Sequence, residues 1–65
     1  MVKYGKVIEY NGEYGLIQNK DGIVDFEKKD LSTSVKVGDI VEYREEKGNY
    51  LLLARNIKVV DEYEN

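Results

Sequence analysis

The 65-residue sequence contains no cysteine, no histidine and no proline. Without cysteine, the chain can form neither a disulfide nor a thiolate metal site. Without histidine, it lacks the commonest general base and the commonest metal ligand, and its carboxylates do not have the spacing of a calcium loop. A single domain of this size also leaves little room for a catalytic pocket. We therefore expect no enzymatic activity, no cofactor and no metal, and a stability margin limited by a small core.

Long hydrophobic runs are also absent from the sequence. No apolar stretch approaches the roughly 20 residues of a membrane-spanning helix, and no basic-then-apolar signal segment opens the chain. We therefore expect a cytoplasmic, monomeric protein with no membrane partner. The sequence is equally compatible with a domain cut from a longer protein.

The net charge of −3 comes from ten basic and thirteen acidic residues. Three of the acidic residues, Asp61, Glu62 and Glu64, lie in the last five positions, so residues 1–60 carry ten charges of each sign. We expect a domain over residues 1–60 followed by an acidic tail over residues 61–65. The neutral body lacks the overall basic footprint that is typical of nucleic-acid binders, and phosphate contacts would require a local basic patch.

Turn residues recur about every 10 positions and divide the chain into strand-length blocks. Asn11-Gly12 and Asp21-Gly22 predict tight type I′ turns after the first two blocks. A single helical turn and a serine/threonine loop fill the longer connection between the third block and the fourth. The plan predicts an all-β, five-stranded antiparallel Greek-key barrel, the OB-fold, with an SH3-like barrel as the alternative. The expected strands are residues 2–10, 13–19, 22–26, 40–46 and 50–60.

Alternation within these blocks selects the side chains expected inside the barrel. Gly5 and Gly15 lie within strands, where a glycine is typical of a bulge or a sharp bend that leaves no room for a side chain. The run Leu51-Leu52-Leu53 is expected to be buried on one face and partly covered on the other. The expected core consists of Val7, Ile17, Val24, Phe26, Leu31, Val41, Tyr43, Leu51 or Leu52, Ala54 and Ile57.

Five short motifs, in order, resemble the bacterial cold-shock domain family. Residues 5–11 read GKVIEYN where the family has G-K-V-K-W-F-N, and residues 12–17 read GEYGLI where it has K-G-F-G-F-I. Residues 23–31 are similar to D-V-F-F-H-x-S-D-L, residues 38–43 to G-x-x-V-x-F, and residues 54–57 to A-x-N-V. The similarity runs from residue 5 to about residue 60. It implies an OB-fold that binds single-stranded RNA or DNA.

The resemblance is strong at barrel-building positions and weak at the family's binding positions. That family binds bases on exposed aromatic rings edged with lysine and histidine, whereas this chain has Ile8, Glu9, Leu16, Asp25 and Glu27 at those places. Tyr10 and Tyr14 keep an aromatic ring. Each lost ring removes a stacking contact worth about 1–3 kcal/mol per base, and the three carboxylates would repel a phosphate chain.

Two functions are therefore expected as alternatives. The first is weak, non-catalytic binding of single-stranded RNA or DNA, with Phe26 open to a core role instead. The second is a protein-interaction module that has lost nucleic-acid binding and turns Glu9, Asp25, Glu27 and the acidic tail toward a basic protein partner. For the first, the expected base-stacking residues are Tyr10, Tyr14 and Phe26, and the expected phosphate contacts are Lys6 and Lys28.

Overall fold

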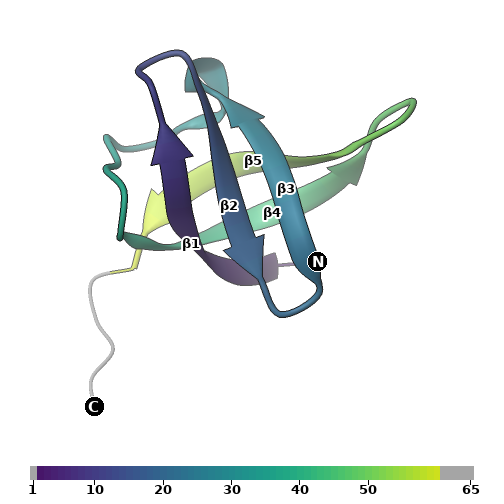
Figure 1. Cartoon of the computed structure of the whole chain (residues 1–65), viewed down its shortest axis with the longest axis horizontal. Helices are drawn as coiled ribbons and strands as arrows, with labels where there is room; N and C mark the ends of the chain where they lie inside the picture. The colour runs from purple at the N-terminus through teal and green to yellow at the C-terminus, as the bar shows by residue number, and fades with distance from the viewer. Residues whose placement is uncertain (1, 61–65) are drawn as a thin grey trace.

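Five short strands close into a barrel in the order β1-β2-β3-β5-β4 (Figure 1). The computed structural model describes residues 2–60, so the expected acidic tail over residues 61–65 lies outside the described residues. The five-stranded barrel and the helical turn predicted after the third strand are confirmed. The elements are β1 (Val2–Tyr10), β2 (Tyr14–Asn19), β3 (Gly22–Glu27), the 3₁₀ helix η1 (Lys28–Asp30), β4 (Ile40–Lys47) and β5 (Leu52–Val59).

Four of the five strand contacts are antiparallel, as predicted: β1 with β2, β2 with β3, β1 with β4, and β4 with β5. The contact that closes the barrel between β3 and β5 is parallel and has a single residue pair, Asp25 with Leu53. This closing contact brings the start of β5 beside the outer surface of β3, which matters for the site described below.

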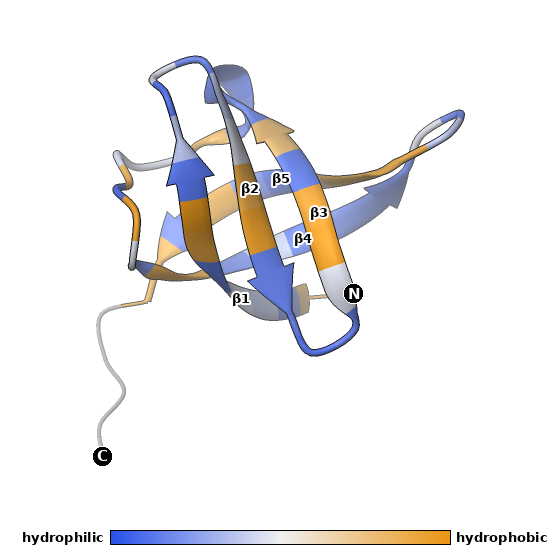
Figure 2. Cartoon of the chain, viewed as in Figure 1, coloured by the Kyte–Doolittle hydropathy of each residue, from blue (hydrophilic) through white to orange (hydrophobic). Residues whose placement is uncertain are grey.

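The core lies inside the barrel and consists of apolar side chains from all five strands. Figure 2 shows where apolar residues occur along these strands. Leu31, which follows η1, is half-buried and packs against this core. The core prediction is therefore confirmed except for the expectation that Leu51 or Leu52 is buried. The buried hydrophobic residues are Val7, Ile17, Val24, Phe26, Val41, Tyr43, Ala54 and Ile57.

The expectation that Leu51 or Leu52 belongs to the core is wrong. Leu51 is 53% exposed and Leu52 is 42% exposed, and Ala54 takes the first core position of β5. The physical reason is that residues 46–52 form the tip of the β4–β5 hairpin, which projects beyond the barrel (Figure 1). We call this segment the arm. Among residues 2–60, no further strand pairs with the outer edges of the arm, so the three consecutive leucines are not all buried.

The prediction of type I′ turns is also wrong, because the two hairpins use other geometry. Positive φ occurs at Gly12 and Gly22 but at neither Asn11 nor Asp21. The Asn11 side chain instead accepts hydrogen bonds from the backbone N–H groups of Glu13 and Tyr14, both at 2.9 Å, which closes a three-residue connection. Such Asx turns satisfy the backbone without left-handed geometry at the asparagine.

The strand glycines lie where the expected crowding is found. A Cβ atom on Gly5 would lie 2.6 Å from Ile17 Cγ2 and 2.7 Å from the carbonyl oxygen of Gln18. These distances are too short for any side chain, so glycine lets β1 approach β2 closely at this bend. The prediction that Gly5 and Gly15 mark tightly packed points of a small barrel is confirmed.

Candidate functional site

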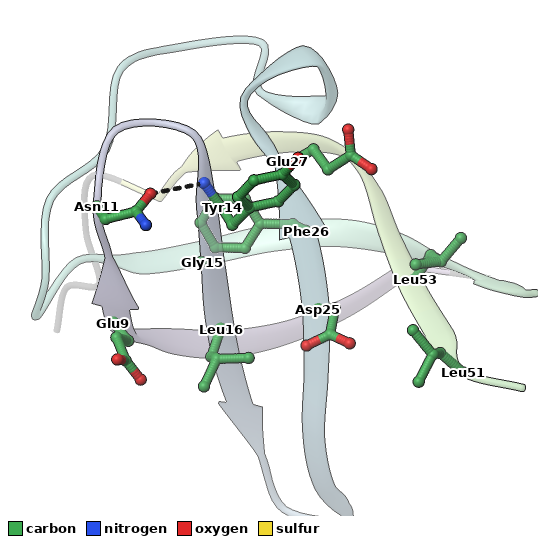
Figure 3. Close-up of a pocket in the computed structure, with 10 residues that line it drawn as sticks. All are labelled: Glu9, Asn11, Tyr14, Gly15, Leu16, Asp25, Phe26, Glu27, Leu51 and Leu53. Carbon is green, nitrogen blue, oxygen red and sulfur yellow. Dashed lines mark hydrogen bonds between the residues drawn. The ribbon is translucent and has the colours of Figure 1, made fainter.

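The outer surface of β1, β2 and β3, together with the start of β5, contains a shallow hollow of about 480 Å³ (Figure 3). Its chemistry is mixed, because carboxylates stand around an apolar floor. We call this surface the acidic face. The residues that line it are Glu9, Asn11, Tyr14, Gly15, Leu16, Asp25, Phe26, Glu27, Leu51 and Leu53.

Strand register places the side chains of the acidic face in two rows. Across the strands, Glu9 pairs with Leu16, Leu16 with Asp25, and Asp25 with Leu53. Two residues further along β2 and β3, Tyr14 pairs with Glu27. Residues that face each other across neighbouring strands point to the same side of a sheet, so acidic and apolar side chains alternate across this surface.

A β-bulge in β1 is what turns Glu9 outward. Side chains alternate along a regular strand, so Glu9 would otherwise share the inward direction of Val7, which is fully buried. The register shifts between Val7 and Glu9, and the extra residue reverses the alternation. The same shift places Tyr10 opposite Gly15 on the inner side, where its ring packs against the core.

The floor of the acidic face is formed by Phe26 beneath Gly15. Phe26 is 1% exposed, and its ring centroid lies 5.4 Å from that of Tyr10. The alternative role for Phe26, as a core residue, is therefore the one found, and its ring offers no open face for stacking a base. Tyr10 is likewise half-buried against the core. Of the three expected stacking residues, Tyr14 alone is well exposed, at 62%.

The two expected phosphate contacts lie elsewhere. Lys6 is exposed on β1, where it pairs with Gln18 outside the hollow. Lys28 lies in η1 and lines a separate hollow with Tyr10 and the loop 32–35. The structure therefore does not bring the five residues expected to bind nucleic acid together on one surface. It does bring together Glu9, Asp25 and Glu27, the three carboxylates that the sequence had placed on the ligand-facing side.

The carboxylates of the acidic face have no basic partner within the described part of the chain, although Glu27 forms a capping box with Asp30. Among residues 2–60, no lysine or arginine lies within ion-pair distance of Glu9, Asp25 or Glu27. Elsewhere, several of the basic residues do have acidic partners. These ion pairs join Lys3 to Asp21 and Glu45, Lys36 to Asp39, and Arg55 to Asp30 and Glu46.

Beside the acidic face, one buried carboxylate has a structural role. Asp30 accepts a hydrogen bond from the backbone N–H of Glu27 at 3.0 Å, and its other oxygen lies 3.6 Å from Arg55 Nε. These contacts hold η1 against β5 and fix the end of β3. Asp30 therefore supports the position of Glu27 without lining the hollow itself.

Two leucines of the acidic face were not expected there. Leu51 and Leu53 reach it from β5 and the arm because β5 closes onto β3 at a single pair. No local pattern in the sequence encodes that contact.

Within residues 2–60, no group of three or more carboxylate, histidine or cysteine side chains is placed to hold a metal ion. The described helical residues include no segment of the length and hydrophobicity needed to span a membrane.

Neither a protein-family model nor a curated protein sequence matches this chain. Among solved structures, it is similar to Drosophila Unr CSD456, with a TM-score of 0.76 at 16% sequence identity. The chain has a cold-shock-like OB-fold. That result decides between the two barrels expected from the sequence and excludes the SH3-like alternative. The match covers 92% of this chain and 27% of the Unr chain, so this chain spans only part of the length of the longer structure.

Proposed function

We propose that this cold-shock-like domain is a non-catalytic binding module, and that its acidic face binds a positively charged segment of a partner protein. The observation that supports this proposal is the set of three carboxylates, without basic partners among residues 2–60, around an apolar floor. They stand where the resembled family has base-stacking and basic residues.

Binding at the acidic face would depend on both its carboxylates and its apolar side chains. Exposed ion pairs contribute only about 0–1 kcal/mol each and are screened by salt. The carboxylates therefore select and orient a cationic partner, whereas most of the affinity must come from covering the apolar side chains of Leu16, Leu51 and Leu53. A basic segment with no apolar side chain would bind weakly.

A second candidate function is the binding of single-stranded nucleic acid. The structural similarity to a cold-shock domain favours it, and Tyr14 exposes a ring on which a base could stack. The three carboxylates on the same surface oppose it, because bringing a phosphate chain near them costs electrostatic free energy. Burial of Phe26 and Tyr10 further reduces the available aromatic surface.

A paired titration separates the two candidates. Fluorescence anisotropy would follow a labelled lysine- and leucine-containing peptide and a labelled oligothymidine of equal length, both at low salt. We expect the peptide to bind, to weaken as salt is raised, and to weaken again in the E9Q/D25N variant. The matched control E13Q/E42Q removes two charges from outside the hollow and should behave as the wild type. Tighter binding of oligothymidine than of the peptide, lost on Tyr14→Ser, would replace this proposal by the second candidate.

A further inference from the structure

We propose that the segment bound on the acidic face is extended and has an apolar side chain between two basic ones, at positions i, i+2 and i+4. This inference rests on the proposed function and adds the sequence pattern of the partner. It follows from the order in which charged and apolar side chains occur across the strands. Attraction between opposite charges alone would not select a partner with this order.

The order across the strands is acidic, apolar, acidic, apolar. Glu9 on β1, Leu16 on β2 and Asp25 on β3 lie side by side across the sheet, and Leu53 of β5 follows (Figure 3). Leu16 therefore lies between two carboxylates. A ligand that crosses the strands meets a negative charge, an apolar contact and a second negative charge in sequence.

The spacing suits alternate residues of an extended chain. Neighbouring strands lie about 4.8 Å apart, so the Cα atoms of Glu9 and Asp25 are separated by about 10 Å with Leu16 midway. Side chains that point the same way from an extended segment recur about every 6.6 Å. The spacing of alternate residues, about 6.6 Å, is longer than the spacing of strands, about 4.8 Å. The flexible four-carbon stem of each lysine can span this difference on either side of the apolar residue.

The apolar position of the ligand lies over Leu16. Leu16 is half-buried, and Leu51 of the arm and Leu53 of β5 line the same hollow on the far side of Asp25 (Figure 3). An aliphatic side chain seated on Leu16 would remove apolar surface of both side chains from water. In the second row, Tyr14 and Glu27 form a cross-strand pair, so an additional cation can contact a carboxylate and an aromatic face together.

Two peptides of identical composition test this pattern. The first contains Lys-Ser-Leu-Ser-Lys between neutral flanks, and the second contains the same residues with the two lysines adjacent and the leucine moved to the opposite end. We expect the first to bind about tenfold more tightly, the effect of seating one apolar side chain. Equal affinities would overturn the pattern and leave the proposed function intact, whereas failure of both peptides to bind would contradict the proposed function itself.

A protein variant makes the same test from the other side. Leu16→Ser should weaken binding of the patterned peptide more than binding of the scrambled peptide, so that most of the tenfold preference is lost. Ile23→Ser is the matched control, because Ile23 is an exposed residue of β3 that does not line the hollow. A preference that persists in Leu16→Ser, with thermal unfolding showing both variants folded, would contradict the assignment of Leu16 as the apolar contact.

Discussion

The ring of Phe26 packs directly on the backbone of Gly15, and the space that a Cβ atom of residue 15 would occupy is filled by that ring and by the carbonyl oxygen of Glu9. This contact joins β2 to β3 at the floor of the acidic face. Phe26 points into the core while its neighbours in sequence, Asp25 and Glu27, face outward, as alternation along a strand requires.

Substitution of Gly15 by alanine should therefore destabilise the domain. The added methyl group would displace the Phe26 ring, and overpacking of this kind costs about 1–3 kcal/mol of unfolding free energy. Urea denaturation followed by tyrosine fluorescence measures the change. Gln18→Ala on the same strand, at an exposed position, is the control and should change the free energy little. Unaltered stability of Gly15→Ala would show that the ring can move without cost.

Asn56 should be replaceable by glycine but not by alanine. It has a φ of 55° at the point where the register of β4 and β5 shifts, and its side chain is exposed. Left-handed geometry costs ordinary residues about 1–2 kcal/mol, whereas glycine adopts it freely. We expect Asn56→Gly to unfold at or above the wild-type temperature and Asn56→Ala to unfold below it. The opposite order would contradict the assigned geometry.

Tyr43 should ionise at a higher pH than an ordinary tyrosine. Burial raises the pKa of Tyr43 above its ordinary value of 10.0, although a hydrogen bond from Asn19 lowers it in part. Because the fold favours the neutral phenol, its stabilising contribution is complete below pH 10 and is lost as the pH rises through the folded-state pKa. Ultraviolet titration should show a late phase that coincides with unfolding and disappears in Tyr43→Phe. A titration of the folded protein in which Tyr43→Phe removes no late phase would contradict this.

Asp30, which is buried, should contribute more to the free energy of unfolding than an exposed aspartate does. Replacing it by alanine leaves the backbone N–H of Glu27 without its acceptor and removes a charge beside Arg55. Loss of a partner for a buried polar group costs about 1–3 kcal/mol. We expect thermal unfolding of Asp30→Ala at a clearly lower temperature, with Asp30→Asn intermediate because an amide oxygen can still accept. Equal melting of Asp30→Ala and the wild type would assign η1 no part in stability.

Much of the barrel was predictable because its information is local. Val7, Ile17 and Val41 stand at alternating apolar positions, and alternation within a strand is enough to assign them to the core. The three carboxylates of the ligand-facing side were also predictable, since their positions correspond to motifs of a resembled family whose fold the structure confirms.

The remaining features depend on contacts between distant parts of the chain. The bulge in β1 reverses the direction of Tyr10, and its position is set by pairing with β2. The exposure of Leu51 depends on how far the β4–β5 hairpin extends beyond the strand that covers β4. Neither the bulge nor the length of the hairpin can be recognised from the alternation within a single strand. Tyr10 was therefore expected outside the core, and Leu51 or Leu52 inside it.

The central claim is that the acidic face, rather than a basic or aromatic surface, is where this domain binds its partner. Nuclear magnetic resonance titration of the isotope-labelled protein with the patterned lysine–leucine peptide tests it most directly. We expect the largest backbone shift changes at Glu9, Leu16, Asp25 and Leu53, weakened by added salt and absent in the E9Q/D25N variant. Changes confined to the hollow beside Tyr10 and Lys28, or an acidic face that responds to oligothymidine and not to the peptide, would contradict it.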